Sequence, residues 1–184
     1  MWIDTLHESV RADPEAFRAS VEQLAGARIF DLHLQDAVNL QHPSFFDDTQ
    51  HYDMLVFRKL APGEAAPLAE LERADHRRAR ALQEIVTRPI TFFVFDRVLV
   101  TVRNEHSKTI EQMQARLLAE RGPRPANNGE RGPDKLRLPT RPDELMLRLL
   151  NGMVDRYLDL RQPLTERLER WQRELLDPRR TFAD

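Results

Sequence analysis

The chain has no cysteine, which excludes disulfide bridges and thiolate metal sites and indicates a reducing compartment. Glycine is scarce, with 6 in 184 residues, so a loop of backbone amides around a phosphate is not expected. Neither a nucleophile elbow nor a His-Glu-x-x-His helix is present, and we expect no enzyme. No stretch reaches the roughly 20 apolar residues of a membrane span, and a signal peptide is missing.

An excess of one charge is also absent, because 28 basic residues nearly balance 30 acidic ones for a formal net charge of -2. This balance does not indicate nucleic acid or an anionic membrane surface as a partner. The basic stretch 73–80 has no interleaved aromatic residues, and we interpret it as an exposed surface. With 41% hydrophobic and 32% charged residues, the composition is typical of a folded domain with a solvated surface.

The N-terminal part has the pattern of a strand followed by short helices. Alternating apolar and polar residues predict a strand over residues 1–6. A helix should follow Asp13, because Asp13 can cap its first turn, Pro14 suits its first position and Gly26 can end it. A second helix is predicted over residues 30–39.

Further strands are predicted from apolar runs in the middle of the chain. Residues 51–58 are rich in aromatic and branched side chains. Residues 90–95 and 98–102 are separated by two residues, which predicts a hairpin with a tight turn. Continuous apolar runs are typical of strands covered on both faces, although Pro89 should limit the ladder of the first strand. We therefore expect a central sheet with helices on both sides.

The C-terminal part is predicted to be helical. Ser107 can cap a helix that runs to about residue 119, and two Gly-Pro pairs predict a flexible loop over residues 122–139. From Pro142, apolar residues recur every three or four positions, which predicts one long amphipathic helix or two collinear helices joined at Pro163. These apolar residues would form a stripe along the helix that is unusually long for a compact domain. Such a stripe indicates a partner helix or a continuation of the chain.

Side chains that could hold a divalent cation gather in three places. Hard cations such as Mg²⁺ prefer oxygen ligands and keep several waters. For these places we favour helix capping, turn formation and a solvated charged face, respectively, with metal ligation as the alternative. The candidates are a helical trio, a following cluster and an i, i+4 pair: Asp31, His33 and Asp36; Asp47, Asp48, His51 and Asp53; Asp155 and Asp159.

Taken in order, these segments resemble the cytosolic domain of the CorA family of magnesium transporters, whose ZntB branch shares the domain. Residues 2–4 resemble the family's first strand, and residues 31–39 (DLHLQDAVN) its G-L-H-P-L-x-x-E-D-x-L-N helix. Residues 51–57 (HYDMLVF) resemble its Y-D-x-Y-L-F strand. The best match is the hairpin 92–103 followed by residues 143–157, which resemble the L-L-x-x-L-x-D-x-I-V-D-x-Y helix.

The sequence also departs from the family pattern. Gln35 stands where the family usually has Glu, and Leu34 replaces a common Pro. The stretches 62–80 and 122–139 look longer than is typical. The family's stalk helix, membrane helices and Gly-Met-Asn pore motif are not found here, and Asn-Gly-Met at 151–153 is not that motif.

The resemblance implies an α+β fold. Residues 1–141 would form a three-layer α/β/α sandwich with a mixed, largely antiparallel sheet, and residues 142–184 would begin a long C-terminal amphipathic helix or helical arm. It also implies that stalk and transmembrane helices lie outside this chain. The membrane would be contacted only through them.

The function implied by the resemblance is regulatory. The domain would form the funnel of a homopentamer on the cytoplasmic side of the bacterial inner membrane, sensing Mg²⁺ or another divalent cation (Co²⁺, Ni²⁺ or Zn²⁺) and gating the pore. No cofactor is required beyond that cation, and the isolated chain should be a monomer or weak dimer. The family's metal sites do not transfer to any single residue, so Asp31, Asp36, Asp47, Asp48, Asp155 and Asp159 stay as candidates.

Two other functions are compatible with the residues. A free-standing interaction module would use the exposed helical stripe to bind a partner helix. A hydrolase would need the Asp and His side chains of residues 31–53 to converge in one pocket.

Overall fold

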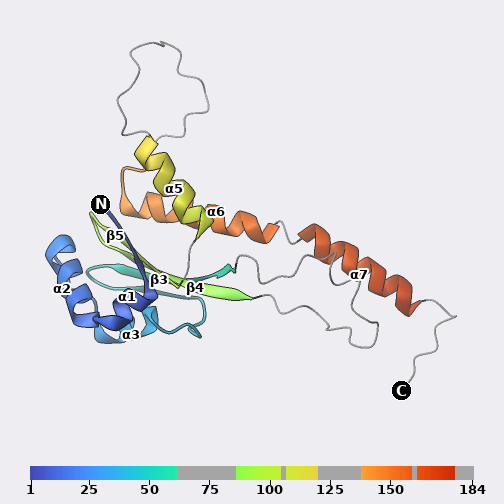
Figure 1. The fold of residues 1–184 in the computed structure, drawn as a ribbon, viewed down its shortest axis with the longest axis horizontal. Coiled ribbons are helices and arrows are strands. Elements are labelled where there is room, and N and C mark those ends of the chain that lie inside the picture. The colour runs from blue at the N-terminus through green and yellow to red at the C-terminus, as the bar shows by residue number, and fades with distance from the viewer. Residues whose placement is uncertain (62–85, 105–106, 120–137, 159–160, 177–184) are drawn as a thin grey trace, which may run out of the picture.

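The computed structural model describes residues 1–61, 86–104, 107–119, 138–158 and 161–176. These residues form a five-stranded sheet in the order β1-β5-β4-β3-β2 (Figure 1). β1 pairs with β5 in parallel and the other pairs are antiparallel, so the predicted mixed, largely antiparallel sheet is confirmed. The strands are β1 Trp2–Leu6, β2 Phe45–Asp48, β3 Asp53–Leu60, β4 Thr87–Val94 and β5 Leu99–Arg103.

Helices cover both faces of the sheet, which confirms the predicted three layers (Figure 1). The first face carries α1 (His7–Ala12), α2 (Pro14–Ala25) and α3 (Asp31–Ala37). The second face carries α5 (Lys108–Ala119) and α6 (Pro142–Leu158), and α7 (Arg161–Leu175) extends away from the sheet. Among the described helices, none combines the length and the apolar character that a membrane span requires.

The apolar run of β4 is explained by two cores. Neighbouring residues of a strand point to opposite faces, and Phe92 and Phe93 are both fully buried, one in each core. Phe93 packs in the core with Val21 of α2, whereas Phe92 packs in the core with Leu149 of α6. A central strand between two helical layers therefore needs no polar face.

The predicted signals at the ends of α2 are all in place. The Asp13 carboxylate accepts a hydrogen bond from the Ala16 amide at 2.9 Å, and Pro14 occupies the first turn. Gly26 ends the helix in the left-handed conformation with φ 79°, which other residues rarely adopt. α3 is shorter than the predicted helix 30–39, and no side chain caps its start at Phe30.

The predicted hairpin is confirmed as β4 and β5. The Phe95 amide donates to the Val98 carbonyl at 2.9 Å across the tight turn. β4 pairs with β3 along its whole length, but its pairing with β5 begins only at Ile90, directly after Pro89. Pro89 therefore limits the β5 ladder as expected, since it has no N–H to donate.

The interpretation of Asp47 and Asp48 as turn residues is wrong. Both lie in β2, opposite Met54 and Asp53 of β3. The turn follows them: the Thr49 hydroxyl accepts from the amides of residues 51 and 52 at 3.3 and 3.0 Å. Because the Thr49 hydroxyl binds the backbone amides of the turn, Asp47 and Asp48 are not needed for this role and can extend the strand.

The C-terminal helical pattern forms two helices, and their boundary precedes Pro163. α6 ends at Leu158 and α7 begins at Arg161, so Pro163 lies in the first turn of α7. Proline is tolerated there because the first amides of a helix have no intrahelical acceptor. The ambiguous stretch 62–80, most of the predicted loop at 122–139 and Asp159 lie outside the described residues.

Candidate functional site

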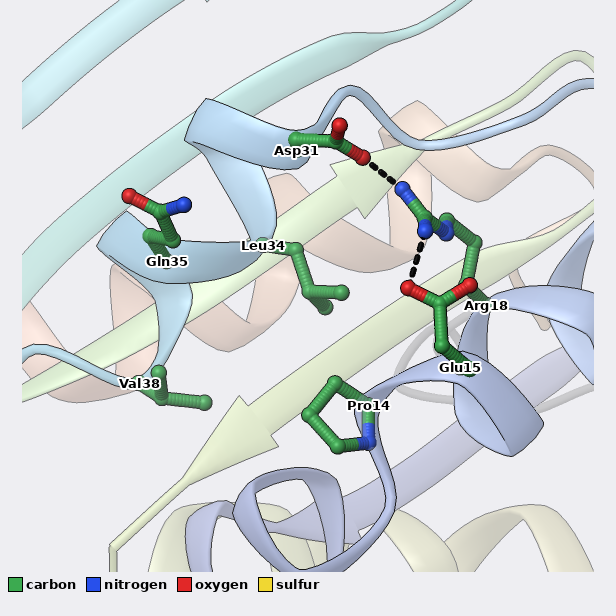
Figure 2. Close-up of a pocket in the computed structure, with 7 residues that line it drawn as sticks. All are labelled: Pro14, Glu15, Arg18, Asp31, Leu34, Gln35 and Val38. Atoms are coloured by element: carbon green, nitrogen blue, oxygen red, sulfur yellow. Dashed lines mark hydrogen bonds and ion pairs between the residues drawn. The ribbon is translucent and has the colours of Figure 1, made fainter.

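Asp31 lies beside a pocket of about 360 Å³ between α2 and α3 (Figure 2). Arg18 reaches from α2 to this pocket and forms ion pairs with both Glu15 and Asp31. Its side chain is buried, and the Glu15 carboxylate holds the pKa of Arg18 above its ordinary value. The same contact lowers the pKa of Glu15. Asp31 is thus bound to a guanidinium, which also closes α3 onto α2.

A chain of hydrogen bonds runs from the edge of the sheet into the core beneath α1, α2 and α3, and it consists of Asp47, His33 and Tyr52. His33 is buried, and its Nε2 lies 2.9 Å from Asp47 while its Nδ1 lies 2.9 Å from the Tyr52 hydroxyl. Because a carboxylate only accepts, Nε2 is assigned the proton and Nδ1 accepts from Tyr52. The Tyr52 oxygen accepts in turn from the Phe30 amide at 2.9 Å, and burial raises the pKa of Tyr52.

Contacts with Asp36 and Arg58 hold the segment that follows α3 in place. The Asp36 carboxylate lies 3.5 Å from Nε2 of His42. Arg58 donates to the Leu40 and His42 carbonyls at 3.2 and 2.9 Å, and to the Thr87 hydroxyl and carbonyl at 2.9 Å each. The only sequence signal for this contact was that Arg58 directly follows the apolar residues 54–57.

Asp48 and Asp53 face each other across β2 and β3. Burial raises the pKa of Asp53, and a hydrogen bond from this carboxyl to Asp48 and the negative charge of Asp48 raise it further. Two adjacent carboxylates repel when both are ionised, which makes this end of the hairpin electronegative. Neither has an ion-pair partner among the residues that the structure describes.

The sequence candidates thus form separate pairs. Within the described ranges, no group of three His, Asp or Glu side chains could hold a metal ion. Asp31, Asp47 and Asp36 are paired with Arg18, His33 and His42, respectively. These ion pairs do not bring the Asp and His side chains of residues 31–53 into the single pocket that the hydrolase hypothesis required. Asp155 lies on the exposed side of α6.

A buried ion pair anchors the edge strand β1 and could not be found from sequence. Arg103 contacts both oxygens of Asp4 at 2.8 to 3.0 Å, with only 10% and 9% of the two side chains exposed. Thr101 donates to Asp4 at 2.8 Å, Gln114 of α5 donates to it at 3.2 Å, and the Trp2 indole donates to Thr101 at 3.1 Å. This network satisfies a carboxylate beneath α5.

α6 carries apolar residues on two opposite sides. Leu145, Leu149 and Met153 are buried against the sheet. Leu147, Val154 and Leu158 are 54%, 44% and 63% exposed, and their spacing places them along one line on the opposite side of the helix. α6 therefore offers a second apolar surface to solvent.

α7 carries a second line of exposed apolar residues. Leu164, Leu168 and Leu175 are 40%, 64% and 64% exposed, and Trp171 completes the 4-3-4 spacing of a helix that packs on another helix. We call Leu147, Val154 and Leu158 of α6, with Leu164, Leu168 and Leu175 of α7, the outer stripe. Exposed apolar surfaces of this kind are typical of interaction sites.

The family model described as CorA-like Mg²⁺ transporter protein matches residues 19–183. No curated protein matches the chain.

Three solved structures share the fold. The full-length CmaX protein aligns with a TM-score of 0.58 at 14% identity, over 100% of this chain and 44% of that one. The soluble domain of CorA from Methanocaldococcus jannaschii aligns with a TM-score of 0.51 at 17% identity, over 95% of this chain and 55% of that one.

The complete CorA magnesium transporter from the same organism aligns with a TM-score of 0.53 at 14% identity, over 95% of this chain and 43% of that one. The chain thus spans about half the length of these proteins. At such identities the alignments show a shared fold, and the family model provides the assignment. It covers far more than half of the sequence. The chain therefore belongs to the family of CorA-like Mg²⁺ transporter proteins.

Proposed function

We propose that this chain is the regulatory domain of a CorA-like divalent-cation transporter and forms a funnel in a homopentamer on the cytoplasmic side of the bacterial inner membrane. The observation that carries this proposal is the outer stripe, whose residues are 40% to 64% exposed. Family membership supplies the kind of assembly in which such a stripe would be buried.

The outer stripe favours association with a neighbouring helix. Full burial of a leucine contributes about 1.5 to 3 kcal/mol, so three leucines on α7 alone could supply several kcal/mol. Part of that gain is lost because association restricts the motion of the partners. Five copies in a closed ring would bury the stripe on every subunit, whereas a monomer leaves it in water.

Asp155 is the described candidate best placed for a cation between subunits. It follows Val154 of the outer stripe and has no ion-pair partner among the described residues. Packing the stripes would bring carboxylates of neighbouring subunits closer together and raise their repulsion. A divalent cation with its retained waters would offset that repulsion, because Mg²⁺ is bound through few carboxylates.

Gating follows from the difference in cation affinity between two assemblies. If the packed funnel binds cations better than the loosened one, high internal Mg²⁺ favours the packed form and a closed pore. Loss of the cation restores repulsion and shifts the population toward the loosened form.

The proposal is tested by Mg²⁺ titration of the full-length protein. We expect one pentameric species whose cleavage by protease slows at millimolar Mg²⁺. Asp155→Asn should weaken this protection, while Asp96→Asn, in the exposed β4–β5 turn, should leave it unchanged. Unchanged cleavage over the whole titration would rule the proposal out.

A second candidate function uses the same stripe. A free-standing module would dock an amphipathic partner helix on Leu164, Leu168 and Leu175. In that case Leu168→Asp would abolish partner binding, and the full-length protein would stay monomeric at every Mg²⁺ concentration. The size of the assembly thus separates the two functions.

A further inference from the structure

β2 is an edge strand with unusual side chains. It is the last strand of the sheet and pairs only with β3 among the described strands. Phe45 and Phe46 are 41% and 59% exposed, although phenyl groups are normally buried. Natural edges avoid pairing by being short and charged. β2 has both of these features, yet it also displays two aromatic rings.

The turn after β2 shows which backbone groups face the open edge. The Thr49 amide donates to the Tyr52 carbonyl at 3.1 Å, so these two residues form a hydrogen-bonded pair. Such pairs alternate along antiparallel strands. Asp47 is therefore bonded to β3, whereas the N–H and C=O groups of Phe46 and Asp48 point away from β3. Two residues with outward donors and acceptors can form up to four backbone hydrogen bonds with an added strand.

The side chains at this edge define what such a strand would carry. Phe46 and Asp48 lie on the same face, since side chains two residues apart share a face of the sheet. Behind them in β3 lie Leu55 and Asp53. An apolar residue would contact Phe46, and a cation would relieve the repulsion between the carboxylates of Asp48 and Asp53, which lie opposite each other.

A second copy of β2 fits this edge poorly. In the antiparallel registers that place Asp47 opposite Asp47 or Asp48 opposite Asp48, two strands of sequence Phe-Phe-Asp-Asp would bring carboxylates together. Like charges across a strand pair are destabilising. Charge complementarity therefore favours a basic segment of another protein over this chain's own β2.

We propose that the open edge of β2 binds an extended basic segment of a partner protein by antiparallel strand addition. In the direction of the partner's chain, a Lys or Arg lies opposite Asp48 and an apolar residue two positions later lies opposite Phe46. The backbone hydrogen bonds hold the strand, and the two side chains select its sequence. This surface lies on the β2 edge and is separate from the outer stripe.

Two short peptides test the proposal on the 184-residue protein. Both have the pattern charged-x-aromatic, with Lys in one and Glu in the other. At low salt we expect the Lys peptide to bind at least about tenfold more tightly, with amide shifts in the nuclear magnetic resonance spectrum centred on Phe46 and Asp48. Equal affinities, or shifts centred elsewhere, would overturn it.

Two variants test the backbone hydrogen bonds and the charge of Asp48 separately. Phe46→Pro removes an outward N–H that β3 does not use, and should weaken Lys-peptide binding at least about tenfold. Asp48→Lys should invert the preference toward the Glu peptide even if the proline variant folds poorly. Leu118→Ala, at a leucine 67% exposed on α5, is the matched control and should bind normally.

Either variant binding both peptides like the unchanged protein would refute the proposal. So would concentration-dependent dimerisation that Phe46→Pro abolishes, because the edge would then be an interface between copies of this chain.

Discussion

Gly152 sets the distance between α5 and α6, and replacing it gives a prediction with a calculable sign. A Cβ atom added at Gly152 would lie 2.9 Å from Cγ2 of Thr109. Carbon atoms pack best at about 3.5 to 4.0 Å. Thr109 is branched at Cβ, so its methyl group cannot move without rotating the whole side chain or shifting α5. The added methyl group is therefore in conflict with the helix packing.

Two opposing effects determine the stability of Gly152→Ala. Alanine favours a helix interior over glycine by about 1 kcal/mol. Overpacking costs about 1 to 3 kcal/mol. We expect the free energy of unfolding to fall by about 0 to 2 kcal/mol in the unchanged background. With Thr109→Ser the clashing methyl group is gone, and Gly152→Ala should then stabilise the protein by about 1 kcal/mol.

Urea unfolding of the four proteins of this cycle measures the coupling between the two positions. The expected value is about 1 to 3 kcal/mol. Asn151→Ala is the control, because Asn151 is exposed on the same helix and should give the same change in both backgrounds. A coupling below about 0.5 kcal/mol would mean that Gly152 does not set the α5–α6 distance.

Three further predictions concern polar side chains that are buried or half-buried. Asp4→Asn should lower the free energy of unfolding by about 3 to 5 kcal/mol in urea titration, because it breaks the buried ion pair between Asp4 and Arg103. Tyr52→Phe should cost about 1 to 3 kcal/mol in thermal unfolding, since its partners lose a buried hydrogen bond. Asp53 has a folded-state pKa above its ordinary 3.8, so stability falls as pH rises from 3.8 through the folded pKa. Asp53→Asn should therefore stabilise the protein at pH 7 and have no such effect below pH 3.8, and a gain that is independent of pH would contradict this reasoning.

The elements that sequence predicted well carry local signals. The hairpin of β4 and β5 followed from two apolar runs around a two-residue turn, and α2 followed from Asp13, Pro14 and Gly26. In each case the residues that define the element lie within one short stretch. Helices on both sides of the sheet followed from strands without a polar face.

The features that sequence missed depend on residues far apart in the chain. Asp4 and Arg103 are 99 residues apart and meet only because β1 lies parallel to β5. The pair of Asp31 with Arg18 requires α3 to lie against α2. β2 was missed because four residues ending in two aspartates resemble a turn until β3 lies beside them.

The candidate metal residues show the same limit. For the acidic groups near residues 31–53, helix capping and turn formation were favoured and ligation was the alternative, yet packing gave three of them basic or imidazole partners. Which carboxylates could face a neighbouring subunit depends on the orientation of α6 and α7. That orientation became visible only in the fold, where Asp155 lies beside the outer stripe.

Transport by the full-length protein in lipid vesicles tests the central claim most directly. Mg²⁺ flux would be followed with a dye while the Mg²⁺ concentration on the side of this domain is raised to millimolar levels. The account predicts that flux falls as this Mg²⁺ rises, and that Asp155→Asn shifts the inhibition to higher concentration while Asp96→Asn does not. Flux that is independent of Mg²⁺ on that side would contradict a cation-sensing role for this domain.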